Sequence, residues 1–279
     1  MKLKTLFNEY LNYQRARVSK DWHDLLVSRL NSTWEQLLRK QVEKVRPVDI
    51  EKAIFERYKD HNPMPRRMIN MELGMLRAVF NFGMKRGYII TNPARALDFL
   101  PIEKKERKLL TSEEMKKLID AAIGMFKPYL TVMKYTLARS RELNNLKWED
   151  IDLENRSIIL YTNKTGGRGS RADRLPLRKE AYDVLHELHE KKREGEEYVF
   201  GRKKPYAYKI KRLRKLCKKI GIPNIGFHDI RRYGASILAS KNIPLRDIQD
   251  ILRHTDIKNT QLYMKSVEGG LKRAIEALE

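Results

Sequence analysis

Apolar residues recur at helical spacing through the first hundred positions of the chain. The first such group has spacings of three, one, three and one, which marks one face of a helix: Leu3, Leu6, Phe7, Tyr10 and Leu11. The same periodicity predicts three more helices, with apolar positions at Trp22, Leu25, Leu26, Leu30 and Trp34; at Ile54, Phe55 and Tyr58 after Pro47; and at Ile69, Leu73, Leu76, Val79, Phe80 and Met84, ending near Gly87. These apolar faces predict a helical domain with its own core over residues 1–100.

A polar stretch follows this helical region. Thr91-Asn92-Pro93 interrupts the pattern, and residues 101–108 are polar with few apolar anchors, which is typical of an interdomain linker. The next helix has a clear start, because Thr111 or Ser112 supplies an N-cap and acidic residues fill the first turn.

The remainder of the chain mixes strand and helix patterns. Residues 151–153, 158–161 and 174–177 read as short strands, and residues 165–170 as the turn between the last two. We therefore predict a mainly α protein with a small β-sheet, in which a helical domain precedes an α+β domain over residues 109–279.

The charge balance predicts a polyanionic partner. Lys and Arg outnumber Asp and Glu by 59 to 36, giving a net charge of +23, and nucleic acid is the usual partner of so basic a chain. A ribosome-associated or generally adhesive basic protein is the alternative. Residues 202–219 contain ten Lys or Arg and no acid, yet keep an apolar stripe. They predict a helix near 207–220 that packs on one side and faces the polyanion, or simply solvent, with the other.

Other classes of protein are disfavoured. The single cysteine, Cys217, excludes a disulfide framework and a cysteine-based zinc site. No stretch approaches the roughly 20 apolar residues of a membrane span, so we expect a cytoplasmic protein without a membrane partner.

Six residues are candidates for phosphoryl-transfer chemistry. Arginine neutralises a phosphoryl group, histidine or lysine moves a proton, and a phenol can attack phosphorus. The candidate catalytic residues are Arg139, Lys164, His228, Arg231, His254 and Tyr263. The sequence shows no P-loop or acidic metal cluster, and we expect no metal, nucleotide or other cofactor.

Four motifs resemble those of the tyrosine recombinases, the phage integrase family. Residues 136–152 are similar to the first arginine motif, and residues 163–177 to the β-hairpin with its active-site lysine. Residues 227–232 are similar to the His-x-x-Arg motif, and residues 252–263 to the closing Leu-Gly-His…Thr…Tyr motif. The resemblance covers residues 109–267, and residues 1–100 resemble more loosely the helical, SAM-like core-binding domain of that family.

The resemblance assigns a role to each candidate. Arg139 and Arg231 would clamp the nonbridging oxygens, and Lys164 would be the general acid for the leaving 5′-oxygen, with Arg168 and Arg171 as other cations of the hairpin. His254 would donate to the phosphate, and His228 would accept the tyrosine proton or hold the phosphate. Tyr263 would attack, giving a 3′-phosphotyrosyl linkage. Glu142 and Asp150 are expected to orient or cap.

The sequence departs from the family pattern at four positions. Leu137 stands where glycine is common, Arg141 where serine or glycine is usual, and Arg253 where glycine precedes the histidine. Arg232 replaces a frequent histidine. We expect Arg141 and Arg253 to add bulk and charge beside the site without removing a catalytic group.

The resemblance implies a site-specific DNA recombinase that integrates or excises a mobile element, with Xer-type chromosome resolution as another possible role. Its partner would be double-stranded DNA, bound as a homotetramer on paired sites, with accessory DNA-bending or directionality factors. The C-terminal helix, at Leu271, Ala274, Ile275 and Leu278, would pack on its own subunit or exchange to a neighbour. A type IB topoisomerase and a catalytically inactive DNA-binding protein are the rival interpretations.

Overall fold

The computed structural model describes residues 1–58, 64–103, 109–163, 170–201 and 206–264, with the side chains at 58, 163, 170 and 262–264 outside the described set. The described residues form two compact units, one up to residue 103 and one from residue 109 onward. Each unit has its own buried core. The mainly helical fold class with a small sheet is confirmed, whereas the linker at 101–108 and the functions of the two domains stay predictions.

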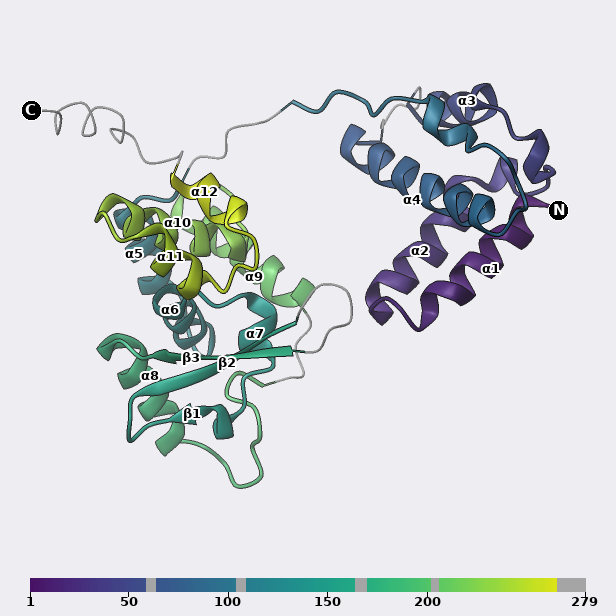
Figure 1. The fold of residues 1–279 in the computed structure, drawn as a ribbon. Helices are drawn as coiled ribbons and strands as arrows, with labels where there is room; N and C mark the ends of the chain where they lie inside the picture. The colour runs from purple at the N-terminus through teal and green to yellow at the C-terminus, as the bar shows by residue number, and fades with distance from the viewer. Residues whose placement is uncertain (59–63, 104–108, 164–169, 202–205, 265–279) are drawn as a thin grey trace, which may run out of the picture. The chain divides into compact units, whose positions relative to one another are not determined.

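The first unit consists of the four predicted helices (Figure 1). Their bounds are α1 Leu3–Arg15, α2 Lys20–Thr33, α3 Pro47–Tyr58 and α4 Arg66–Lys85, with short 3-10 turns at Glu35–Leu37, Val42–Lys44 and Pro93–Ala96. Every predicted apolar position of α1 is buried. This core also takes in Leu26, Leu30 and Trp34, together with the apolar face of α4.

Two residues that the apolar pattern predicts to lie in this core are exposed instead. Trp22 is 42% exposed and Phe55 is 59% exposed. Trp22 lies in the first turn of α2, where its backbone N–H donates to the Ser19 side chain at 3.3 Å. The core is reached only from the following turns of that helix. On α3, Ile50 and Ala53 are the buried positions, so the helix turns Phe55 outward.

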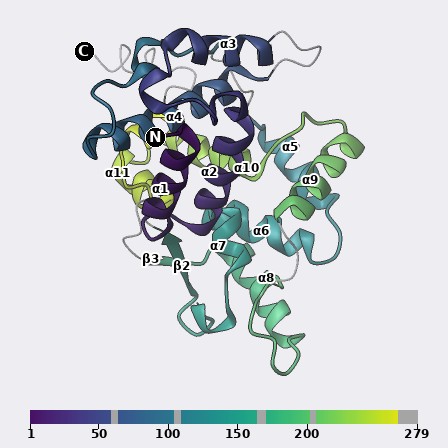
Figure 2. The same ribbon diagram turned by 90° about the vertical axis from the view of Figure 1, so that its right-hand side faces the viewer.

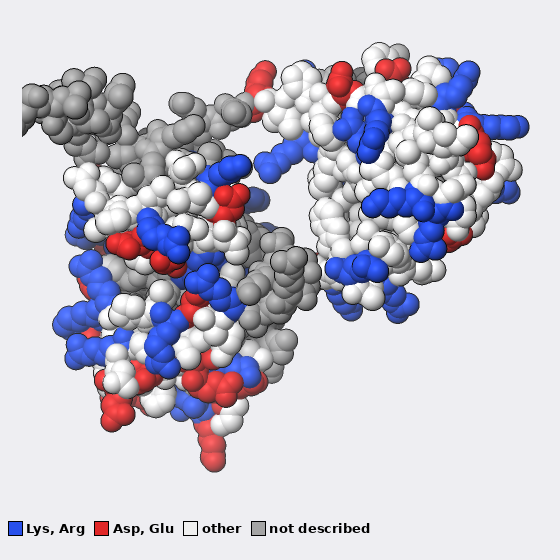
Figure 3. All heavy atoms as spheres, viewed as in Figure 1, with Lys and Arg blue, Asp and Glu red and all other residues white. Residues whose placement is uncertain are grey.

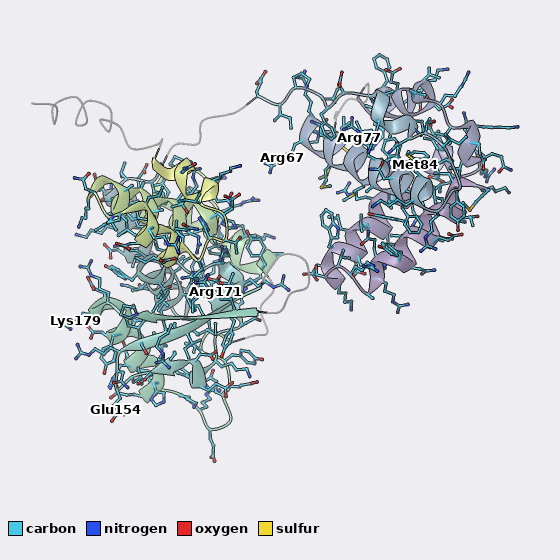
Figure 4. All side chains as sticks on the ribbon, viewed as in Figure 1. Arg67, Arg77, Met84, Glu154, Arg171 and Lys179 are labelled. Atoms are coloured by element: carbon cyan, nitrogen blue, oxygen red, sulfur yellow. The ribbon has the colours of Figure 1, made fainter. Side chains whose placement is uncertain are left out.

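The segment after α4 is tied back onto that helix. Asn70 donates to the Leu100 carbonyl at 2.9 Å and accepts from the Leu100 N–H at 2.8 Å. Arg77, labelled on α4 in Figure 4, donates to the Ala94 carbonyl at 2.9 Å, and its guanidinium lies 4.2 Å from the centre of the Phe99 ring. The first unit therefore holds its own chain as far as residue 100.

The first unit also contains a buried carboxylate. Glu72 of α4 is 1% exposed, and its two oxygens accept from Arg29 at 3.2 Å and from Arg57 at 2.6 Å. Two cations on one buried carboxylate link α2, α3 and α4.

The second unit places a small sheet among helices (Figure 1). The elements are α5 Ser112–Asp120, α6 Phe126–Thr136, α7 Ser140–Asn144, a 3-10 turn Trp148–Asp150, β1 Ile151–Asp152, β2 Ser157–Asn163, β3 Ser170–Pro176, α8 Lys179–Glu190, α9 Tyr206–Ile220, α10 Phe227–Ser240, α11 Leu245–Leu252 and α12 Lys258–Met264. Helix α5 begins with the N-cap that its sequence predicts: the cap is Thr111, which forms a capping box with Glu114.

The three strands form an antiparallel sheet in the order β1-β2-β3. Ile158 of β2 pairs with Ile151 on one side and Leu175 on the other. All three predicted strands are present, with β2 and β3 longer than predicted. The predicted turn lies largely outside the described residues, as does the predicted C-terminal helix.

Helices surround the core of this unit. Helix α6 packs on α8, and α5 lies beside α9 (Figure 2). Helices α10, α11 and α12 pack on one another. A small separate cluster joins α10 and α11 to the end of α6 through Leu137, Ala235, Ala239, Ile248 and Leu252. None of the helices in the described residues combines the length and the hydropathy of a membrane-spanning segment.

Candidate active site

Arg139 stands at the start of α7, where a carboxylate fixes both its backbone and its side chain. The Arg139 N–H donates to Glu142 Oε2 at 2.7 Å, which caps the helix. The Arg139 Nη1 donates to Glu142 Oε1, also at 2.7 Å. The expectation that Glu142 orients its neighbours is confirmed, and Asp150 likewise caps its turn by accepting from the Lys147 N–H at 3.0 Å.

Glu142 is the buried centre of this arrangement. Its side chain is 3% exposed, and Oε1 also accepts from the Thr162 hydroxyl of β2 at 2.9 Å. Burial raises the pKa of Glu142, but the positive charge of Arg253 and the hydrogen bonds and charge of Arg139 outweigh that effect and leave the pKa below its ordinary value. The carboxylate is therefore ionised at neutral pH.

Arg231 lies in the second turn of α10 and is 1% exposed. The helix begins where Asp229 accepts from the Gly226 N–H at 2.8 Å. The two terminal nitrogens of Arg231 donate to the carbonyls of Leu137 and Leu252. Both carbonyls lie at the C-terminal ends of helices, α6 and α11, where they have no partner within the helix. Arg231 thus joins the ends of two helices.

The residues that end these two helices are not glycine, yet both have a left-handed backbone conformation. Leu137 has φ of 50° and Arg253 has φ of 51°, a conformation that costs an ordinary residue roughly 1–2 kcal/mol relative to glycine. These are two of the positions where the sequence departs from the glycine of the family pattern. The backbone keeps the glycine conformation at both positions although the side chains have changed.

Arg253 adds charge beside the site, as expected, but its side chain is buried and does not line the cavity. Its side chain is 0% exposed and forms an ion pair of 2.8 Å with Glu142 Oε2. The guanidinium also donates to the carbonyls of Leu137, Thr136 and Ile251, at 3.1, 3.4 and 2.7 Å. Arginine is tolerated at this depth because a carboxylate and helix-end carbonyls accept hydrogen bonds from its guanidinium.

His254 follows directly and lies among these cations. Its ring Nδ1 is 2.9 Å from the hydroxyl of Thr260, a fully buried residue of α12. Burial, followed by the charges of Arg231, Arg139, Arg253 and His228, lowers the pKa of His254 to about 4. The imidazole is therefore neutral at pH 7 and has one N–H to donate.

A cavity of about 200 Å³ brings three candidates together. Its lining includes Arg139, His228 and Arg231, with Arg141 and Tyr206 beside them. The structure thus confirms that Arg141 adds charge at the site itself. Tyr206 was missed by sequence reasoning, because an aromatic residue at the start of a basic helix carries no motif. Its ring meets Phe227 edge-on, with centroids 5.8 Å apart.

The other two candidates lie beyond the described side chains. Lys164 is outside the described residues. Tyr263 belongs to α12, which packs against α10 and α11, although its side chain is outside the described set. Position 263 follows Thr260 by three residues, so the helical repeat puts both positions on one face of α12.

Helix α9 carries the predicted basic stripe, but one of its cations is buried. Lys209 is 6% exposed, donates to Asn144 Oδ1 at 2.5 Å and lies 4.4 Å from the centre of the Tyr129 ring. The Tyr129 hydroxyl in turn is 2.9 Å from that of Ser140 in α7. Lys209 thus anchors α9 to the helix that Arg139 starts. Lys211, Arg214, Lys215, Lys218 and Lys219 are the exposed cations of α9.

Cations are found on both units, as the visible face in Figure 3 shows. Among the described side chains, no three His, Cys, Asp or Glu residues gather as metal ligands.

The fold, with its helical unit and its α+β unit, is that of the tyrosine recombinases. The phage integrase family matches residues 108–268, more than half of the chain, and the chain belongs to this family.

Curated relatives span most of the chain. The tyrosine recombinase XerA of Pyrococcus horikoshii is 27% identical over 218 residues, which cover 75% of this chain and 73% of the relative. The tyrosine recombinase XerC of Bacillus pumilus is 25% identical over 98% of this chain and 94% of its own length.

Solved structures agree in fold. The Tn1549 transposon integrase in complex with a circular intermediate DNA superposes with a TM-score of 0.80 at 18% identity, covering 100% of both chains. A lambda integrase tetramer bound to a Holliday junction gives a TM-score of 0.74 at 19% identity, covering 92% of this chain and 78% of that one.

Proposed function

We propose that the protein is a site-specific DNA recombinase that cleaves and rejoins strands through a 3′-phosphotyrosyl intermediate. The observation that carries this proposal is the single cavity lined by Arg139, His228 and Arg231, with the neutral His254 among the same cations. Forked guanidinium donors match the nonbridging oxygens of a phosphodiester and stabilise the charge that develops on them.

The reaction exchanges one phosphorus–oxygen bond for another. The Tyr263 oxygen attacks the scissile phosphorus, the bond from phosphorus to the 5′-oxygen breaks, and the 3′-phosphate remains on tyrosine. The phenol has a pKa near 10 in water, so its proton must be accepted as it attacks, which is the role we assign to His228. Lys164 protonates the leaving 5′-oxygen, and reversal onto another 5′-hydroxyl rejoins the strands. Neither metal nor nucleotide enters this scheme.

His254 contributes as a neutral donor. Its low pKa keeps the ring uncharged, so it adds a hydrogen bond to the phosphate and no further positive charge to a cavity that the guanidiniums of Arg139, Arg141 and Arg231 already line. Its position is fixed from both sides, because the backbone N–H donates to the Gln249 carbonyl and the His254 carbonyl accepts from the Gln249 side chain at 3.0 Å.

The domain roles follow from the same proposal. Residues 1–100 would bind one side of the DNA as a core-binding domain, residues 101–108 would link, and residues 109–279 would catalyse. The solved relative on circular intermediate DNA supports DNA as the partner, and the lambda integrase tetramer supports a tetramer on paired sites. The topoisomerase alternative is not favoured, because the curated relatives and fold neighbours are recombinases and integrases.

The decisive experiment captures the covalent intermediate and identifies the target site at the same time. The protein is incubated with nicked duplexes that carry a randomised core. Cleavage near the nick releases a short strand, which is lost and cannot be religated. Protein-linked DNA is then isolated after denaturation and sequenced. We expect a defined core sequence from the wild type and no adduct from Tyr263→Phe.

Tyr206→Phe is the matched control, because Tyr206 also lines the cavity. It should retain the adduct. If Tyr206→Phe lost the adduct and Tyr263→Phe kept it, Tyr206 would be the nucleophile. If neither the wild type nor any variant formed an adduct, the proposed activity would be refuted.

The biological role can be tested with the selected sequence. We propose integration or excision of a mobile element, which predicts that copies of the core flank a segment containing the gene. A single copy at the region where chromosome replication ends would instead indicate dimer resolution.

A further inference from the structure

Arg253 stands where the family pattern has glycine, and its side chain makes contacts that a glycine could not make. The left-handed backbone there is one that glycine adopts freely, and an arginine holds it only at a conformational cost. The side chain is completely buried. A long cation in such a place is expected to persist only where its contacts compensate for strain and desolvation.

Those contacts converge on the loop that carries Arg139. Both terminal nitrogens of Arg253 are used: Nη1 on the carbonyls of Thr136 and Ile251, Nη2 on the Leu137 carbonyl and Glu142 Oε2. Only Nε is buried without a partner among the described residues. Arg253 thus connects the end of α11 with the segment from the end of α6 to the first turn of α7.

The connection closes into a ring around Arg139. Glu142 accepts from Arg253 on one oxygen and from Arg139 on the other, at 2.8 and 2.7 Å. The Arg139 Nη2 in turn lies 3.4 Å from the backbone carbonyl of Arg253. One residue therefore meets the Arg139 side chain twice, directly through its carbonyl and indirectly through the carboxylate.

We propose that Arg253 is a positioning residue that fixes Glu142 and thereby aims the Arg139 guanidinium into the cavity. This inference rests on the proposed function, in which Arg139 binds the scissile phosphate. A glycine at position 253 would supply the carbonyl but leave Glu142 without its buried counter-charge. Among the described residues, Arg139 would then be the one cation paired with Glu142, and Oε2 would keep only the Arg139 backbone N–H as a donor, while Thr162 still donates to Oε1. The position of the Arg139 guanidinium would depend on a less firmly held carboxylate.

The first test measures cleavage. Arg253→Met keeps an unbranched side chain that reaches as far as Nε of arginine but lacks the guanidinium. Arg246→Met removes an exposed cation of the same helix, paired with Asp250 at 3.7 Å. With a nicked substrate under single-turnover conditions, Arg253→Met should slow cleavage about 10- to 100-fold, as a misaimed catalytic group does. The DNA affinity of this variant should stay within about twofold of the wild-type value, because a side chain with no exposed surface cannot contact DNA. Arg246→Met should cleave like the wild type.

A double-mutant cycle separates positioning from general support of the fold. In an Arg139→Lys background the forked donor is already absent, so adding Arg253→Met should slow cleavage by less than about threefold. An equal loss in both backgrounds, or no loss in either, would overturn the proposal. Arg253→Lys keeps the charge and should fall between wild type and Arg253→Met, which preserves the test if the methionine variant unfolds.

A second measurement does not depend on catalysis. In ¹⁵N spectra of the arginine side chains of the free protein, Arg139 should show slowly rotating, resolved Nη groups in the wild type and averaged ones in Arg253→Met or Arg253→Lys. Unchanged Arg139 signals in both variants would refute positioning even if cleavage were lost. If the wild type forms no DNA adduct but Arg139 loosens as expected, the proposed reaction fails while the positioning stands.

Discussion

The Leu137 side chain fills the space beside the backbone of Gly234, so closely that a Cβ at position 234 would overlap Leu137 Cδ2. Leu137 is 4% exposed and held in a left-handed conformation, and its carbonyl accepts from both Arg231 and Arg253. The glycine missing from the loop is thus matched by a glycine in the facing helix. A side chain at one position needs the absence of a side chain at the other.

Gly234→Ala should therefore destabilise the protein by about 1–3 kcal/mol, the usual cost of overpacking, despite the better helix propensity of alanine. Leu137→Ala should be destabilising by itself. The double variant Leu137→Ala with Gly234→Ala should lose less than the sum, with a coupling of about 1 kcal/mol or more. Urea unfolding of the four proteins measures this, and strict additivity would show that the two positions do not share the space.

His254 predicts a specific dependence of stability on pH. An unfolded histidine titrates near pH 6.5, whereas the folded pKa is lowered to about 4 by burial and nearby cations. Between these values the unfolded chain binds more protons, so the free energy of unfolding falls as the pH drops through this window. After allowance for solvent screening, the loss from pH 7 to pH 5 should be about 1 kcal/mol.

The matched control is His254→Gln, which lacks the titrating group. The difference in unfolding free energy between the two proteins, measured at both pH values, isolates His254 from the other groups that titrate. A difference that does not change with pH would contradict the lowered pKa.

Glu72 should be essential to the first unit only. Glu72→Gln leaves Arg29 and Arg57 without their carboxylate, and breaking such a buried pair costs about 3 kcal/mol. Because the two units have separate cores, we expect calorimetry to show one transition shifted down and the other unchanged. Glu56→Gln, at an exposed glutamate that accepts from Gln36 at 2.6 Å, is the control and should shift neither. A uniform shift of all unfolding would mean that the units unfold as one.

The cations of α9 should divide into two kinds. Lys209→Met removes a buried cation that binds Asn144, so it should lower stability and leave the salt dependence of DNA binding unchanged. Lys215→Met removes an exposed cation and should leave stability unchanged. If Lys215 contacts a phosphate, the slope of log affinity against log salt should become shallower by about 0.9. Equal salt slopes for Lys215→Met and the wild type would exclude this contact.

The sequence was sufficient for the elements, because helix and strand periodicity depend on local spacing. The four first-unit helices and the strand pairs are where the apolar pattern predicts them. Trp22 is exposed because periodicity identifies an apolar face without saying how far along the helix the core extends. Phe55 is exposed because it lies off the face of α3 that buries Ile50 and Ala53.

The site was only partly predictable. Motif spacing identified Arg139, His228 and Arg231, which the structure brings to one cavity, and the catalytic roles stay predictions. Lys209 and Arg253 illustrate what was missed: each is a cation whose partner lies 65 or 111 positions away. No local pattern reveals such a partner, and burial of a charge depends on it.

Replacing unusual residues by those most frequent in a family is a common way to stabilise a protein. The left-handed ends of α6 and α11 make that strategy hazardous here. A glycine introduced at position 253 would remove the strain of the left-handed backbone but also the arginine that pairs with the buried Glu142. A glycine at position 137 would leave a cavity beside Gly234. In a chimera with a homologue, residues 137 and 234 should therefore be exchanged together, and so should residues 142 and 253. This means transferring the loop before α7 together with the ends of α6 and α11.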